Sequence, residues 1–105
     1  MKNRVIKYVA HAVKWFDKVN GNTYHSVRVT RCRDDAVVVA QFQYGYGDQY
    51  RHSALIAMAD AKWLPVKYRD NVLAFERDKN YPIQWHCTDG LKRDCVANGK
   101  VEGKQ

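Results

Sequence analysis

The sequence has little of what marks several large classes of protein. It contains two prolines, six glycines and three cysteines, and none of its apolar runs is long enough to cross a bilayer. The cysteines are odd in number and widely spaced, which argues against a disulfide framework and predicts reduced thiols. The opening stretch MKNRVIKYVAHAV begins like a signal peptide, but Lys7 and His11 interrupt its apolar part. We therefore expect a mature protein in the cytoplasm.

Acidic residues are scarce relative to basic ones. The 105 residues include 11 Asp and Glu against 18 Lys and Arg, which gives a formal net charge of +7. A surplus of this size on a small domain attracts polyanions and anionic ligands. It also favours solubility, and composition alone does not separate these two uses.

Recognisable catalytic and metal-binding motifs are absent from the sequence. None of its four histidines stands in an HxH or HExxH pair, so we predict no metal site and no cofactor. His52 and Ser53 are only sequence neighbours, which is no arrangement of nucleophile and base. We expect a protein that is not an enzyme. A small nuclease or phosphodiesterase using His25, His52 or Asp48 is the weaker alternative.

Three stretches in the first half of the chain predict strands. They cover residues 4–17, 23–32 and 36–44. The turn signals NGN and RDD join them, so we expect an antiparallel meander. In the second stretch, alternation points Val27 and Val29 inward and Ser26, Arg28 and Thr30 outward.

The second half of the chain begins with a helical pattern. Residues 48–64 carry apolar side chains at three- and four-residue spacing, with Asp48 as the predicted N-cap and Pro65 as the stop. Residues 67–79 fit either a short helix or a loop with a short strand. Residues 81–99 predict a hairpin around Asp89-Gly90, because this dipeptide favours a tight turn.

The order of these stretches defines the expected fold. We predict an α+β domain with an antiparallel sheet in the order β-β-β-α-β-β and one main helix packed on one face. No linker, repeat or low-complexity segment divides the chain. Residues 1–100 are expected to form one globular domain and residues 101–105 a flexible tail.

The stretch QFQYGYGDQYRHS, residues 41–53, is the most distinctive feature of the sequence. A strand, a glycine turn and a helix N-terminus can together bind an anion, with Arg51 adding a charged fork and Tyr44, Tyr46 and Tyr50 stacking on a base. The spacing is not that of a Walker A loop or a dinucleotide fingerprint. The alternative is structural, since Gly45 and Gly47 permit backbone conformations that other residues avoid.

The outward side of the second strand offers a second candidate surface. Tyr24, Arg28 and Arg31 interleave aromatic and basic groups, a pattern that can follow a phosphate backbone while stacking on bases. The alternative is a sheet face that simply contacts water.

Three segments carry a resemblance to other proteins. WFDKVNGNTYHSVRV, QYGYGDQYR and DGLKRDCVANG resemble segments of short uncharacterised bacteriophage and prophage proteins. The resemblance implies a small accessory protein made in a bacterial host, of a kind that often counters antiviral defence. It supplies no functional residues.

These observations lead to one functional expectation and one rival. We expect a non-enzymatic, phage-type protein that binds a phosphate-bearing ligand, either nucleic acid or a nucleotide. The rival is a protein-interaction module that inhibits a host defence complex; a homodimer is compatible with both. The predicted ligand-binding residues are Tyr24, Arg28, Arg31, Tyr44, Tyr46, Tyr50, Arg51, Lys92 and Arg93.

Overall fold

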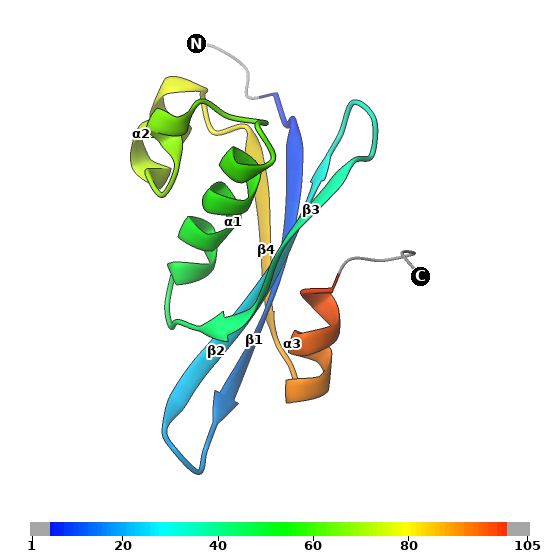
Figure 1. The fold of residues 1–105 in the computed structure, drawn as a ribbon, viewed down its shortest axis with the longest axis vertical. Coiled ribbons are helices and arrows are strands. Elements are labelled where there is room, and N and C mark those ends of the chain that lie inside the picture. Colours follow the sequence, from blue (N-terminus) through cyan, green and yellow to red (C-terminus); the bar gives the residue numbers. More distant parts are fainter. Residues whose placement is uncertain (1–4, 101–105) are drawn as a thin grey trace.

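The computed structural model describes residues 5–100, which form one sheet with helices on both faces (Figure 1). The elements in chain order are β1 (Tyr8–Asp17), β2 (Asn22–Arg31), β3 (Val37–Tyr44), α1 (Gln49–Asp60), the 3-10 helix η1 (Val66–Tyr68), α2 (Val72–Asp78), β4 (Ile83–Asp89) and α3 (Lys92–Asn98). The α+β class is confirmed. The predicted tail, residues 101–105, lies outside the described residues.

The antiparallel meander of β1, β2 and β3 is confirmed. β1 pairs with β2 in continuous register from Tyr8–Arg31 to Asp17–Asn22, and β2 pairs with β3 across a bulge between His25 and Val27. Both predicted turns contain a residue with positive φ, Gly21 at 72° and Asp35 at 61°. Tight turns favour such residues, so local turn chemistry accounts for this part of the sheet.

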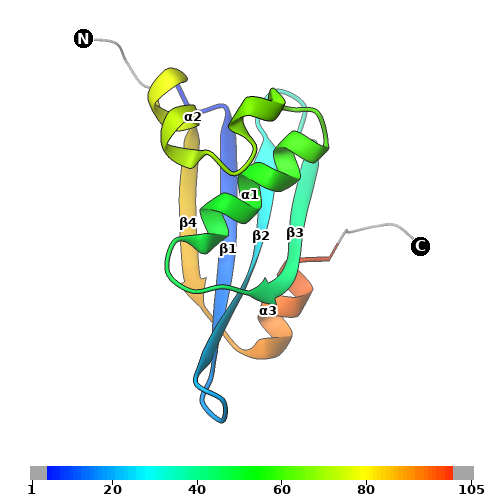
Figure 2. The same cartoon turned by 60° about the vertical axis from the view of Figure 1, so that its left-hand side comes forward.

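The prediction of a wholly antiparallel sheet was wrong. β4 pairs with β1 in parallel, and the strand order is β3-β2-β1-β4 (Figure 2). The chain leaves β3 at one edge, crosses the sheet through α1, η1 and α2, and returns at the other edge (Figure 2). A crossover of this length lets a strand return in parallel, which a short hairpin cannot do.

The predicted C-terminal hairpin was also wrong, because residues 92–98 form α3. The Asp94 carboxylate accepts a hydrogen bond from the Leu91 backbone N–H at 3.2 Å, which satisfies a donor at the start of the helix. Cys95 is fully buried against the sheet, and the Ser26 hydroxyl donates to its carbonyl. Ser26, predicted to face water, is therefore covered by α3.

The main helix begins where it was predicted and ends earlier. Its apolar stripe is confirmed at Ala54, Leu55 and Met58, each with no exposed surface. Asp48 precedes the helix but makes no side-chain capping hydrogen bond. α1 ends at Asp60, and Lys62 takes a φ of 65°, so the chain turns away before Pro65. The stretch left open between helix and loop contains η1 and α2.

One hydrophobic core fills the space between the sheet and the helices α1 and α2. The sheet contributes small residues, Ala10 and Ala12, where α1 lies close, and Leu55, Met58 and Phe75 fill the space from the helices. Burying each of these larger side chains contributes roughly 1.5–3 kcal/mol before entropy is counted. Within residues 5–100, no helix is long and apolar enough to cross a membrane.

Candidate ligand-binding site

The nine predicted binding residues do not form one site. Tyr24, Tyr44 and Lys92 lie around an aromatic cluster near α3, and Arg28 lies further along β2. Tyr46 is at the glycine corner, Tyr50 and Arg51 are in α1, and Arg93 is exposed on α3. Arg31 lines a separate pocket, the basic pocket, together with Lys7, Arg33 and Lys62. Each of these places has to be weighed by its own contacts.

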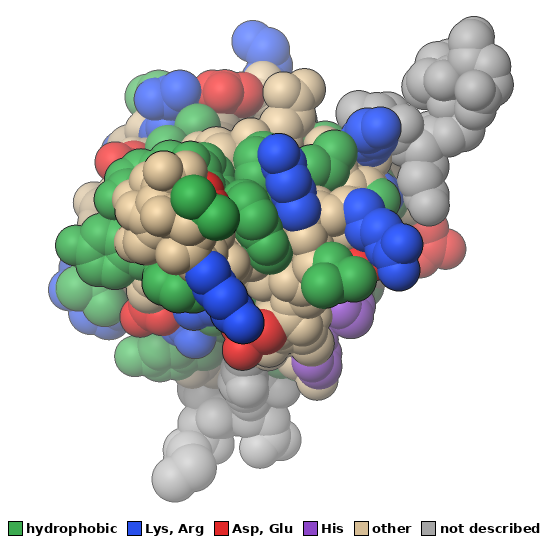
Figure 3. Space-filling view, turned by 90° about the horizontal axis from the view of Figure 1, so that it is seen from below, with side chains coloured by type: hydrophobic (Ala, Val, Ile, Leu, Met, Phe, Trp, Pro, Cys, Tyr) green, Lys and Arg blue, Asp and Glu red, His purple; other side chains and the backbone are tan. Residues whose placement is uncertain are grey.

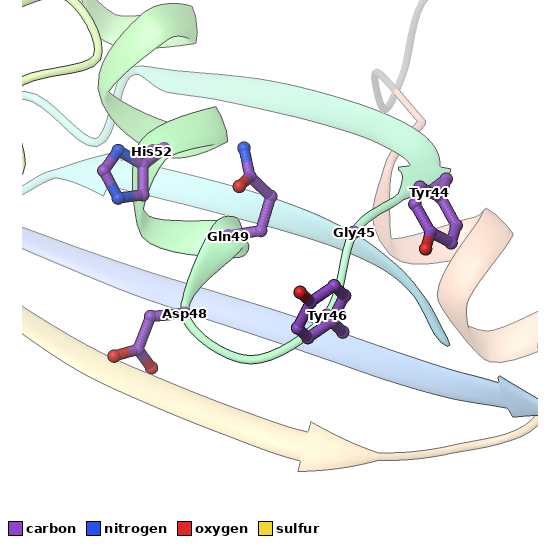
Figure 4. Close-up of a pocket in the computed structure, with 6 residues that line it drawn as sticks. All are labelled: Tyr44, Gly45, Tyr46, Asp48, Gln49 and His52. Atoms are coloured by element: carbon purple, nitrogen blue, oxygen red, sulfur yellow. The ribbon is translucent and has the colours of Figure 1, made fainter. Parts of the chain in front are cut away.

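The glycine corner, whose lining residues are drawn in Figure 4, has a structural reason for its first glycine. A Cβ on Gly45 would lie 2.6 Å from both the His25 ring and the Gln49 side chain, which is closer than real Cβ contacts come. The shallow hollow beside it, about 390 Å³, is lined by Tyr44, Gly45, Tyr46, Asp48, Gln49 and His52. No Lys or Arg is among these lining residues, and the Asp48 carboxylate would repel a phosphate. The corner therefore lacks the charge that an anion site requires.

Tyr50 and Arg51 turn away from the corner and into the fold. The Tyr50 ring is 6% exposed and meets Trp85 edge to face at 5.8 Å. The Arg51 guanidinium lies 5.0 Å from the centre of the Trp85 ring and 3.8 Å from the Glu76 carboxylate. The Trp85 indole N–H donates to Glu76 at 2.9 Å. These contacts join α1, α2 and β4, so both predicted residues hold helices on the sheet.

His25 occupies a buried polar site beneath the corner. Its Nδ1 lies 3.1 Å from the Gly45 carbonyl oxygen and its Nε2 lies 2.8 Å from the Ser53 hydroxyl. A carbonyl oxygen only accepts, so Nδ1 carries the proton and Nε2 accepts from Ser53. Ser53 is 4% exposed and also contacts Gln43 at 3.3 Å. The pair resembles a base and a nucleophile, but burial of both groups makes it a structural network.

This network predicts a loss of stability at mildly acidic pH. Burial lowers the pKa of His25, and the hydrogen bond with Gly45 opposes this only in part. The unfolded chain then binds a proton near pH 6.5 that the folded chain resists, so the free energy of unfolding falls as pH drops below about 6.5. We expect a loss of about 1 kcal/mol between about pH 7.5 and pH 5.5 in urea unfolding.

Two variants distinguish the contribution of His25 to the pH dependence of stability from that of other groups. His25→Gln should flatten the pH dependence over this range, although it lowers the overall stability. His52→Gln is the control and should keep the contribution of His25, because His52 lies outside the buried hydrogen bonds of that residue. A free energy of unfolding that stays constant in the wild type as the pH falls would contradict the assignment of His25 as a buried neutral group.

The aromatic cluster, made of Trp15, Tyr24, Phe42 and Tyr44, lies on the same side of the sheet as α3. Tyr24 stacks on Phe42 with ring centres 5.1 Å apart and on Trp15 at 5.5 Å, and it meets Tyr44 edge to face. Lys92 lies 5.6 Å from the Trp15 ring centre. Because the ring faces pack against one another, the cluster chiefly stabilises this end of the sheet. Basic and hydrophobic side chains intermingle over the same end (Figure 3).

The segments that line the basic pocket lie at the opposite end of the molecule, the upper end in Figure 1. It is a hollow of about 560 Å³, lined by Ile6, Lys7, Tyr8, Arg31, Cys32, Arg33, Lys62 and Trp63. These residues come from the segment before β1, the end of β2 and the turn after α1. The volume lies within the range of small-molecule sites in proteins.

Charge in the basic pocket is strongly positive. Four of its lining residues, Lys7, Arg31, Arg33 and Lys62, are cations. Asp34 opposes them, and Arg31 donates to it from Nε at 2.9 Å and from Nη2 at 2.7 Å. These hydrogen bonds lower the pKa of Asp34 to about 2. The C-terminus of α1 adds only about half a negative charge. The residues that line the pocket thus include four cations and no carboxylate.

An aromatic pair forms one wall of the basic pocket. Tyr8 and Trp63 stack with ring centres 5.9 Å apart, and the Arg31 guanidinium lies 4.6 Å from the Trp63 ring centre. With Asp34 holding Nε and Nη2, the third nitrogen of Arg31, Nη1, has no hydrogen-bond partner among residues 5–100. The guanidinium is thus fixed in place with donors left for a ligand, as preorganised binding requires.

Sequence reasoning found Arg31 but missed the rest of the basic pocket. The β1–β2 register pairs Tyr8 with Arg31, and the Cys32 N–H donates to the Lys7 carbonyl at 2.9 Å. The predicted hairpin was enough to bring these residues together. Lys62 and Trp63 had no such signal, because their position depends on how α1 lies across the sheet.

Comparisons with known proteins found no match to this chain. No family model, no curated protein and no solved structure matches it.

Proposed function

We propose that the protein binds a phosphate-bearing ligand, a nucleic acid or a nucleotide, in the basic pocket. The observation that carries the proposal is the convergence of Lys7, Arg31, Arg33 and Lys62 on one hollow. Phosphate groups are the common anions that such clusters recognise, and Arg binds them through paired donors. The formal net charge of +7 adds a long-range attraction for the same ligands.

The shape of the basic pocket supports a phosphate carried on a larger group. The hollow has room beyond a single phosphate, and its wall includes Tyr8 and Trp63. A base or sugar reaching this wall gains apolar and cation–π contacts in addition to the charge interaction. A purely inorganic anion would use only the cations.

The proposal is tested by charge reversal at two matched positions. Lys62→Glu changes the charge inside the basic pocket, and Lys18→Glu makes the same change beside the β1–β2 turn at the far end. Lys62→Glu should weaken binding about tenfold, because two charge units change within a few ångströms of the phosphate. Lys18→Glu should weaken it far less, since salt screens distant charges.

Fluorescence anisotropy with labelled short DNA, RNA and a nucleoside triphosphate measures these changes. Affinity should also fall steeply as salt rises, through release of counterions from the ligand. Absence of binding to every one of these probes at low salt would overturn the proposal. Equal losses in the two variants would show that net charge, and not the basic pocket, attracts the ligand.

A protein partner remains the rival function, supported by one observation. β3 is an edge strand that pairs only with β2 within the described sheet. Open edges accept an added strand from a partner. Failure of all the phosphate-bearing probes would favour this rival. The accessory role in a bacterial host, implied by the resemblance to phage proteins, stays a prediction under either function.

A further inference from the structure

We propose that His11 and His86 form a two-imidazole site for a divalent transition-metal ion such as zinc or nickel. The two residues are far apart in sequence, but β1 and β4 pair in parallel and set them directly opposite each other. Their rings lie 5.0 Å apart between centres with an angle of only 13° between planes. Sequence spacing excluded histidine pairs within one element; the parallel ladder creates one between two elements.

Both nitrogens of each ring in this pair are available, whereas His25 has none available and His52 has only one. Among residues 5–100, neither the His11 nor the His86 ring has a hydrogen-bond partner, and both residues are exposed. His25 is buried with both nitrogens engaged, and His52 contacts Asp70 through Nδ1. The pair also has no part in the hydrophobic core. Stacking alone leaves these exposed nitrogens to water, whereas a metal ion would use them.

The strand register, more than the stacked arrangement of the rings, suits one ion shared by the two imidazoles. Neighbouring strands lie about 5 Å apart, but the nitrogen lone pairs lie within the ring planes, so both stacked rings must tilt before the lone pairs converge on one ion. Metal–imidazole bonds of about 2.0–2.1 Å require the two nitrogens to approach to about 3.3 Å. Exposed side chains reach this by rotating about χ1 and χ2, while the hydrogen-bonded ladder holds the backbone. The strands therefore preorganise the site without fixing the final bond lengths.

The chemistry of the ligands selects the kind of metal. Neutral imidazole suits zinc, nickel and copper, whereas magnesium and calcium prefer oxygen ligands. Two protein ligands leave further coordination positions for water or for an oxygen of a bound molecule. Arg28, the cross-strand neighbour of His11, places a cation on the same face. At a hydrated surface its repulsion weakens binding by less than about tenfold.

Calorimetric titration of the untagged protein with nickel chloride tests the site. His11→Gln and His86→Gln should each weaken nickel binding by at least about tenfold, because a single imidazole remains. Both positions are exposed, so the melting temperature without metal should stay unchanged. In the wild type, nickel should raise the melting temperature by binding only the folded chain.

Two control variants decide whether other groups hold the metal. Cys87→Ser removes the exposed thiol that follows His86 in β4. Side chains alternate along a strand, so Cys87 and His86 point to opposite faces of the sheet. His52→Gln removes the other partly exposed histidine. Both should bind nickel as the wild type does. Wild-type affinity in His11→Gln and His86→Gln would overturn the proposal, as would loss of binding in Cys87→Ser.

Discussion

Replacing Gly45 with alanine is expected to lower the free energy of unfolding by about 3 kcal/mol. The added methyl group would lie 2.6 Å from the His25 ring and from the Gln49 side chain. Overpacking of this kind typically costs about 1–3 kcal/mol. Displacing His25 also weakens its hydrogen bond with the Gly45 carbonyl, which adds about 1 kcal/mol. Urea unfolding followed by tryptophan fluorescence measures the change.

Gly47 is the matched control for Gly45 in the same corner. Its φ is 61°, but an added Cβ would meet nothing within 4 Å. Gly47→Ala should therefore cost only about 1–2 kcal/mol, the penalty of left-handed backbone in a residue with a side chain. Equal costs at the two positions would contradict the packing account and leave backbone conformation as the sole reason for both glycines.

The outcome also bears on the two interpretations of QFQYGYGDQYRHS. The contacts of Gly45 with His25 and Gln49 explain why this residue has no side chain. Ligand binding at the basic pocket should survive in Gly47→Ala, because the corner and the pocket share no lining residue. Loss of ligand binding in a Gly47→Ala protein that still folds stably would indicate that the glycine corner takes part in binding.

Local sequence signals predicted the meander well. Alternation and turn chemistry act between neighbours in the chain, so Gly21 and Asp35 marked both turns of the first three strands. They failed at Asp89-Gly90, where the same kind of signal precedes a helix. Cys95 and Ser26, which are 69 residues apart, make the hydrogen bond that anchors α3. No local pattern contains that contact.

The candidate sites also depend on contacts between residues far apart in the sequence, which local patterns do not contain. Arg51 looked suited to an anion because of its place in the chain, yet Trp85 and Glu76 attract it into the fold. Lys62 was overlooked because only the packing of α1 on the sheet brings it near Arg31. Charge and residue type favoured a phosphate-bearing ligand, which stays a prediction, whereas the position of the basic pocket depends on tertiary contacts.

Cys32 gives a direct readout of the basic pocket. It is an exposed free thiol in the pocket wall, between Arg31 and Arg33. A ligand that occupies the pocket should shield it from alkylation. Cys87 is an exposed free thiol in β4, opposite Ala12 and outside the pocket lining, so it serves as an internal reference in the same molecule.

The measurement that tests the central claim is the alkylation rate of Cys32 with N-ethylmaleimide, followed by mass spectrometry. It is made with and without the tightest-binding probe among short DNA, RNA and the nucleoside triphosphate. With the probe at about ten times its dissociation constant, alkylation of Cys32 should slow about tenfold, because only the unoccupied fraction reacts. The rate at Cys87 should stay unchanged. An unprotected Cys32 under conditions where anisotropy shows the probe bound would contradict the account.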